Sequence, residues 1–159
     1  MKRLSLHDFV AESNRIEGIS QTTDLEVKVH QELLELPSLE IYNLESFVEQ
    51  IAPGNRLRNK VGVNVRVGNH RPIPGGPKVQ EYLKQILEEA NAIRNKGVQY
   101  DNAWGIHIRY EKLHPFTDGN GRSGRALWLW MHRGNAPLGF LHTFYYETLQ
   151  MFDNQKLQN

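Results

Sequence analysis

Twelve consecutive residues bring together the groups that a polyphosphate and its metal ion require. Positions 114–125 read His-Pro-Phe-Thr-Asp-Gly-Asn-Gly-Arg-Ser-Gly-Arg. His114 can accept a proton, and Asp118 offers carboxylate oxygen to a hard cation. Two glycines around Asn120 let backbone N–H groups come close to an anion. The segment therefore indicates a site for negative charge.

Two arginines follow at the start of an apolar run, 126–131, that predicts a buried helix. Arg122 and Arg125 stand three positions apart, so both guanidinium groups would project from the first helical turn. The helix dipole disfavours cations there, and two such charges argue for an anionic ligand. His114, Asp118 and Asn120 could each be an ordinary loop or core residue when taken alone. The whole constellation favours a functional site.

The segment resembles the Fic-domain signature, His-x-Phe-x-Asp/Glu-Gly-Asn-Gly-Arg-x-x-Arg, at every fixed position. The resemblance implies a mainly α Fic fold, a single-domain helical bundle over residues 1–159. It implies transfer of AMP from ATP to a hydroxyl group of a target protein. It also implies that His114 is the general base and that Asp118 is the Mg²⁺ ligand. Gly119, Asn120 and Gly121 would form the phosphate cradle. Arg122 would contact the β-phosphate and Arg125 the γ-phosphate. Phe116 would anchor the loop in the core.

A second motif lies within residues 1–20. Ser13-Asn-Arg-Ile-Glu17-Gly18 resembles the Fic inhibitory motif Ser/Thr-x-x-x-Glu-Gly/Asn, here on a helix that precedes the core. By residue type alone, Glu17 is an exposed glutamate before a C-terminal cap glycine. The resemblance implies instead an inhibitory helix, in which Glu17 pairs with Arg125 and Ser13 supplies a steering hydrogen bond. Since Arg125 cannot hold a carboxylate and a γ-phosphate together, this helix would restrain transfer.

One segment departs from the helical pattern. Residues 61–67 alternate valine with other residue types, and Gly68-Asn69 follows as a turn. The pattern predicts a short β-hairpin flap over residues 61–72, although the prolines that follow exclude a central strand. On the residues alone the flap covers core. The resemblance favours an edge that docks the target protein through Val63, Asn64 and Val65.

The remaining segments have helical periodicity. Capping boxes begin the first two helices, Ser38 is the expected cap of the third, and Pro77 fits the first turn of the fourth. We expect helices over residues 4–17, 23–36, 38–51, 77–97, 101–113, 120–133 and about 140–152.

Composition limits the class of protein. A chain of 159 residues with 39% apolar and 23% charged residues is long enough for one globular domain. A net charge of +1 argues against nucleic acid or a membrane surface as partner. Without cysteine, a metal must be held by oxygen or imidazole. The lack of an apolar stretch of transmembrane length or a signal peptide favours a cytoplasmic location, and the oligomeric state, homo-oligomer included, is left open.

Other functions compete with this interpretation. Positions 119–124 satisfy the dinucleotide pattern G-x-G-x-x-G, but the preceding segment is helical and no βαβ unit surrounds it, so we reject that function. A metal-dependent hydrolase built on His107, His114 and Asp118 would leave the glycines and arginines unexplained. The same fold could use UTP, GTP or CDP-choline as donor, or remove AMP. A nucleotide-responsive binding module with little turnover is an alternative from another class.

Overall fold

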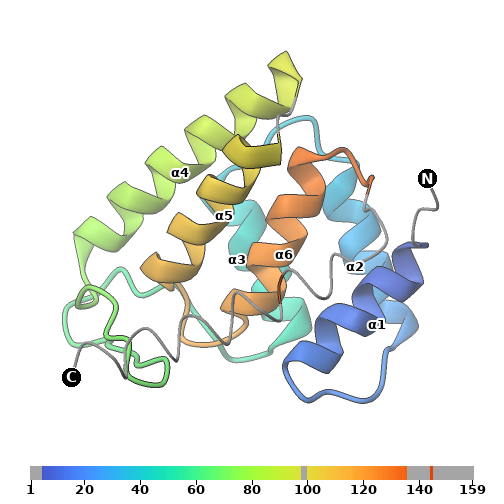
Figure 1. Cartoon of the computed structure of the whole chain (residues 1–159). Coiled ribbons are helices and arrows are strands. Elements are labelled where there is room, and N and C mark those ends of the chain that lie inside the picture. The colour runs from blue at the N-terminus through green and yellow to red at the C-terminus, as the bar shows by residue number, and fades with distance from the viewer. Residues whose placement is uncertain (1–4, 98–99, 136–143, 145–159) are drawn as a thin grey trace.

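The computed structural model describes residues 5–97, 100–135 and 144, which contain six helices. Figure 1 shows α6 near the middle of the bundle, with α4 and α5 on one side, α1 and α2 on the other, and α3 behind α5 and α6. The helices are α1 (Leu6–Ile16), α2 (Asp24–Leu34), α3 (Ile41–Ile51), α4 (Pro77–Lys96), α5 (Tyr100–Leu113) and α6 (Asn120–Met131). The predicted mainly helical fold is confirmed.

The central place of α6 follows from its sequence. After its first turn α6 is apolar on every face, and residues 122–131 are all buried. Contacts reach α6 from each of the other five described helices. Trp130 is fully buried, and its indole N–H donates to the Leu36 carbonyl at 2.9 Å. This packing holds the glycine-rich loop that precedes α6 against the core.

Local sequence signals set several helix starts as predicted. The Ser5 hydroxyl accepts the Asp8 N–H at 3.1 Å, and Thr23 and Glu26 form a reciprocal capping box. Pro77 occupies the first turn of α4. None of the described helices is both long enough and apolar enough to cross a membrane.

Several predicted boundaries are wrong by two or three residues. The second helix ends at Leu34 and not at 36. The third helix begins after Glu40 and not after Ser38, because Asn43 Oδ1 accepts the Glu40 N–H at 2.8 Å and so caps the helix there. The sixth helix ends two residues before the predicted end at 133. The helix expected over residues 140–152 lies outside the described residues.

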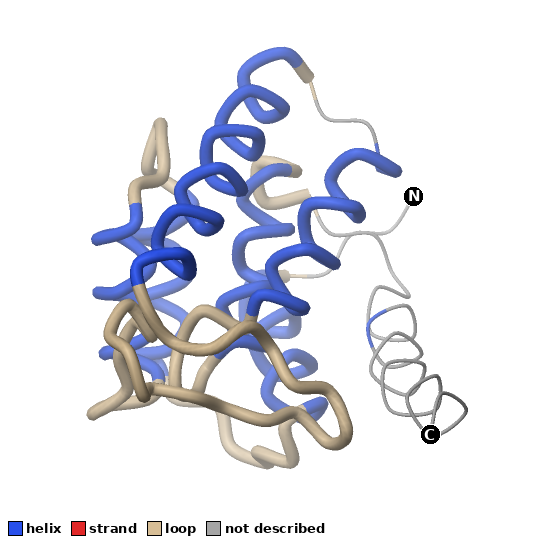
Figure 2. Tube along the Cα trace, turned by 90° about the vertical axis from the view of Figure 1, so that its left-hand side faces the viewer, coloured by secondary structure: helices blue, strands red, loops and turns tan. Residues whose placement is uncertain are grey.

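The predicted flap, residues 61–72, forms a loop and not a β-hairpin (Figure 2). Val67 and His70 exchange backbone hydrogen bonds of 2.9 and 2.8 Å, which closes the predicted turn. The pairing stops there, and the described residues contain no strand. Pro72 and Pro74 lack the N–H groups that a longer ladder needs, which accounts for the wrong prediction.

Because no β-ladder forms, the flap is held by side-chain hydrogen bonds and by close backbone contacts. Asn64 Oδ1 accepts the Gly75 N–H at 2.8 Å. A Cβ atom at position 75 would overlap the carbonyl oxygens of Val63 and Lys60, so only glycine fits there. The flap is therefore a defined loop that packs on itself.

His30 is a buried titratable group of the helical core. Its side chain is 2% exposed, packs edge-on against Phe47, and its Nδ1 lies 2.7 Å from the Glu26 carbonyl. Burial lowers the pKa of His30 to about 4; the hydrogen bond and charge of Glu26 oppose the shift, and Arg122 and Arg125 reinforce it.

The free energy of unfolding should therefore fall on acidification. Because the pKa of His30 is about 4 in the fold and 6.5 in an unfolded chain, the unfolded state binds more protons between these pH values. The contribution of His30 is complete above pH 6.5 and declines toward pH 4. From pH 7 to pH 5 we expect His30 to contribute about 2 kcal/mol to this loss, and His30→Leu should remove that share in urea titrations, whereas the share of His114 stays in both proteins. The same pH dependence in both proteins would contradict this assignment.

Candidate functional site

The loop between α5 and α6 carries the main motif, and a distant segment pairs with it. Residues 56–58 run antiparallel to residues 115–117, with an isolated bridge between Leu57 and Phe116. Directly before this pairing, His114 has a φ of 50°, which residues with a side chain rarely adopt. The paired segment and the buried Phe116 ring hold the loop in this conformation.

The environment of His114 keeps its imidazole neutral. Burial lowers the pKa of His114 to about 4. The Glu111 carbonyl and the Glu17 carboxylate oppose this shift, while Arg58 and His70 reinforce it. At neutral pH the ring is therefore unprotonated, which is the form that can accept a proton from a hydroxyl group.

The start of α6 has the form of an anion site. Gly119 is the N-terminal cap in the left-handed conformation, with φ 81°, and it has no side chain to cap the helix. A Cβ atom at Gly121 would overlap Oε1 of Glu17. The Glu17 carboxylate thus lies over the first turn of α6, where the helix dipole and free N–H groups favour negative charge.

Arg125 joins α6 to α1. Its Nη2 donates to Glu17 Oε1 at 2.8 Å and to the Ser13 carbonyl at 3.0 Å, while its Nε donates to the Ser13 hydroxyl at 2.7 Å. The arginine side chain is 4% exposed and that of Glu17 38%. The structure thus contains the ion pair expected between Glu17 and Arg125. The Ser13 hydroxyl bonds to the arginine, so it orients the guanidinium group.

The side chains of Asn120 and Arg122, also in the motif, form hydrogen bonds with main-chain groups of the fold. The amide of Asn120 accepts the Phe116 N–H and donates to the Phe116 carbonyl, both at 2.8 Å. It therefore shapes the loop and leaves the backbone N–H groups of the turn for an anion. Nη1 of Arg122 donates to the Ile51 carbonyl at 3.0 Å, and its buried Nε makes no hydrogen bond within the described part of the chain. A phosphate contact by Arg122 would require this side chain to change partner.

Asp118 has the character of a Mg²⁺ ligand. Its Oδ1 accepts the Gly119 N–H at 2.8 Å, and the residue is exposed beside the anion site. Magnesium commonly takes one or two carboxylates, phosphate oxygens and water, so this environment fits the ion. The rival metal site on His107, His114 and Asp118 is not formed, because no three possible ligands come together among the described residues. His107 Nδ1 instead lies 3.0 Å from the Gly124 carbonyl.

The expected docking residues lie in the flap. The Val63 carbonyl accepts a hydrogen bond of 3.3 Å from Arg58, and the Asn64 side chain is bonded within the flap. Val65 helps to line a hollow of about 650 Å³ on the flap. Because no strand forms, docking of an extended peptide on these residues remains a prediction.

Arg58 is a site residue that the sequence analysis missed. It is fully buried, and its guanidinium group donates to main-chain carbonyl groups on both sides of the site. Leu113 and His114 accept bonds of 2.8 and 2.6 Å at the end of α5, and Val63 and Ile73 accept bonds of 3.3 and 2.9 Å around the flap. A single buried cation therefore connects the histidine loop to the flap.

Nothing in the local sequence distinguishes Arg58 from a surface arginine. It lies between Leu57 and Asn59 in a segment rich in turn residues, and Arg56 nearby is exposed. The role of Arg58 depends on carbonyl groups 5 to 56 residues away in the chain. Only the tertiary fold brings them together.

The fold and the site together define a class: a helical domain whose central helix begins at a histidine-led, glycine-rich anion site. The sequence profile of the Fic/DOC family matches residues 22–132, about two thirds of the chain, and the protein belongs to this family. Nucleotidyl transfer onto proteins is the general activity of its members. The matched region begins after α1. No curated protein and no solved structure matches the chain.

Arg58→Met should lower the free energy of unfolding by about 3 kcal/mol or more, because it leaves several buried carbonyl groups without a donor. Arg56→Met is the matched control, since that side chain is exposed, and should change stability by less than about 0.5 kcal/mol. Urea titration at pH 7 measures both. Equal losses in the two variants would show that the buried guanidinium group has no special structural role.

Proposed function

We propose that the protein transfers AMP from ATP to a hydroxyl side chain of a target protein, and that α1 inhibits this reaction. The family assignment supports nucleotidyl transfer. A neutral histidine, an exposed aspartate and an uncapped helix N-terminus, close together in the chain, support a reaction at a nucleotide phosphate. Arg122 and Arg125, in the first two turns of α6, favour a triphosphate, and ATP is the donor we propose.

The chain's groups have distinct tasks in this reaction. His114 accepts the proton of the target hydroxyl as its oxygen forms a bond to the α-phosphorus, and the bond to pyrophosphate breaks. The backbone N–H groups of residues 119–121 bind phosphate oxygens, and Arg122 and Arg125 bind the β- and γ-phosphates. Asp118 would hold Mg²⁺, and the ion would neutralise phosphate charge.

The observation that carries the proposal is the position of the Glu17 carboxylate. It lies over Gly121 and pairs with Arg125, which is where a nucleotide phosphate would have to lie. An anion from the chain's own first helix thus occupies an anion site built by the motif. ATP and Glu17 would compete for the same guanidinium group.

Glu17→Gly should raise the rate of AMP transfer. A coupling of about 1–3 kcal/mol between competing ligands gives a gain of roughly 5- to 150-fold. Transfer is measured with ATP, UTP, GTP and CTP, each labelled at the α-phosphate, on the protein itself and on a cell lysate. Glu35→Gly is the matched control, because Glu35 is the exposed C-terminal cap of α2, as Glu17 is of α1.

The outcomes separate the parts of the proposal. A gain with Glu17→Gly alone supports inhibition by α1, and equal rates in all three proteins at saturating ATP would refute it. Labelling from another nucleotide in preference to ATP would replace the donor. Absence of labelling from every nucleotide would contradict transfer.

His114→Ala, made in the Glu17→Gly protein, should abolish transfer and leave nucleotide binding within about two-fold, because the imidazole acts only on the incoming hydroxyl group. Calorimetry with ATP and Mg²⁺ measures binding, and α-labelled ATP measures transfer. His7→Ala, on the exposed side of α1, is the control. Loss of binding together with transfer would make His114 a structural residue.

A further inference from the structure

Charge is distributed unevenly along this nearly neutral chain. Between Glu49 and Glu81 there is no Asp or Glu, although the chain has 18 of them. The same stretch contains six of the 19 Lys and Arg residues: Arg56, Arg58, Lys60, Arg66, Arg71 and Lys78. All but the buried Arg58 are exposed. The flap and the segments that lead to it thus form a positive surface on a chain that is otherwise negative.

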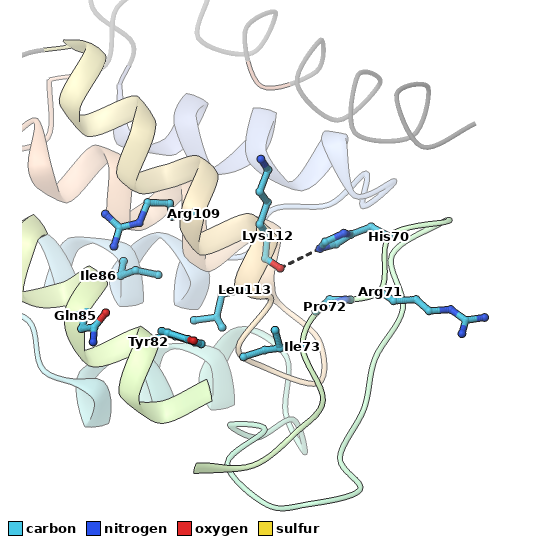
Figure 3. A pocket seen from close by; sticks show the side chains of 10 residues that line it. All are labelled: His70, Arg71, Pro72, Ile73, Tyr82, Gln85, Ile86, Arg109, Lys112 and Leu113. Carbon is cyan, nitrogen blue, oxygen red and sulfur yellow. Dashed lines mark hydrogen bonds between the residues drawn. The ribbon is translucent and has the colours of Figure 1, made fainter. Parts of the chain in front are cut away.

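A pocket of about 350 Å³ lies between this positive segment, α4 and α5 (Figure 3). Apolar side chains from all three form much of its lining, namely Pro72, Ile73, Tyr82, Ile86 and Leu113. Tyr82 is 41% exposed, so part of its ring is accessible to a ligand in the pocket. The pocket has the apolar lining of a site for one large side chain.

Among the described residues, the polar side chains around the pocket are basic or neutral, and none is Asp or Glu. Arg109 is already paired with Glu89. Arg71 and Lys112 make no ion pair among the described residues, and Figure 3 shows both side chains extending away from the apolar lining. Two unpaired cations at the edge of an apolar pocket are complementary to an apolar side chain with carboxylates beside it.

The pocket shares a wall with the catalytic loop. Lys112 and Leu113 immediately precede His114, and the Lys112 carbonyl lies 2.9 Å from Nε2 of His70. A segment bound in the pocket would therefore continue toward the histidine within a few residues.

We propose that this pocket and the basic flap dock an acidic segment of the target protein, whose apolar side chain enters the pocket and whose hydroxyl residue reaches His114. The inference rests on the proposed function and names the substrate class: hydroxyl side chains close to an apolar residue flanked by Asp or Glu. A nucleic acid fits less well, because stacking sites for bases use several aromatic rings, and the described lining has only Tyr82 besides the His70 imidazole.

The test uses two fluorescein-labelled peptides of twelve residues. Each has one Phe three positions before one Thr; one peptide has Glu at six other positions, and the second has Gln there. In fluorescence polarisation at low salt, the Glu peptide should bind about 5- to 10-fold more tightly. The preference should shrink as salt rises.

Charge reversal and truncation separate the two parts of the surface. Arg71→Glu with Lys112→Glu should abolish the preference for Glu, whereas Lys84→Glu, an exposed α4 lysine outside this pocket, should keep it. Tyr82→Ser should weaken binding of the Phe peptide several-fold and leave a Phe→Gly peptide unaffected. Equal binding of the Glu and Gln peptides to the unaltered protein would overturn the proposal, as would stronger competition by a twelve-nucleotide oligouridine than by the Glu peptide.

Transfer from α-labelled ATP in the Glu17→Gly protein provides the second readout. The Glu peptide should have the lower KM, with kcat alike for the two peptides. Self-labelling without discrimination between the peptides would refute docking and leave the proposed transfer intact. Tight, charge-dependent peptide binding without transfer to any acceptor would refute the proposed transfer, and the proposed docking of acidic peptides would still stand.

Discussion

A helix that begins with two arginines beside its own positive dipole needs a negative partner, and this requirement organises the molecule. The first turn of α6 has no side-chain cap, and Arg125 is 3% exposed. A guanidinium group so deeply buried must be paired or fully hydrogen-bonded. In the structure Ser13 and Glu17 of α1 meet that need. A nucleotide phosphate could also pair with Arg125. The same guanidinium group therefore stabilises the fold and would bind the nucleotide in the proposed reaction.

A second buried guanidinium group solves a different problem. His114 must keep a strained backbone conformation and an unprotonated ring at the junction of two helices and a loop without regular structure. Arg58 provides donors to the carbonyl groups on both sides of that junction. Its charge also disfavours protonation of His114. One side chain therefore supports both the geometry and the protonation state of the histidine.

The sequence predicts the parts of this structure that local rules control. The apolar run after Arg125, the capping box at Thr23 and the proline at position 77 each indicate helices that form. The valine alternation over 61–67 fails, because a strand needs a partner with N–H groups and the segment opposite contains Pro72 and Pro74.

Within the site, the motif identifies the residues but not their partners. The Asn120 amide is used to shape the loop, and Arg122 bonds to the Ile51 carbonyl 71 residues away. Such contacts depend on how α3 packs against α6, and no spacing in the sequence records that packing. The contact between Glu17 and Arg125 could be predicted only through resemblance to a motif, since 108 residues separate the two.

The contacts of α1 give the proposed inhibition a route of release that does not require α1 to unfold. Arg125 keeps two bonds to Ser13 when Glu17 departs, so the guanidinium group stays oriented for an incoming phosphate. Asn14 also ties α1 to α2 through bonds of 2.8 Å to Glu26 and 3.2 Å to the Gln21 carbonyl. Among these partners Glu17 is the most accessible to solvent, with 38% of its side chain exposed, so the proposal requires only the Glu17 carboxylate to leave the anion site. Because the coupling is reciprocal, any ligand that displaces this carboxylate must weaken the contact of α1 with α6 by the same free energy. Nucleotide binding would then weaken the docking of α1 on α6 by the same factor as docked α1 weakens nucleotide binding.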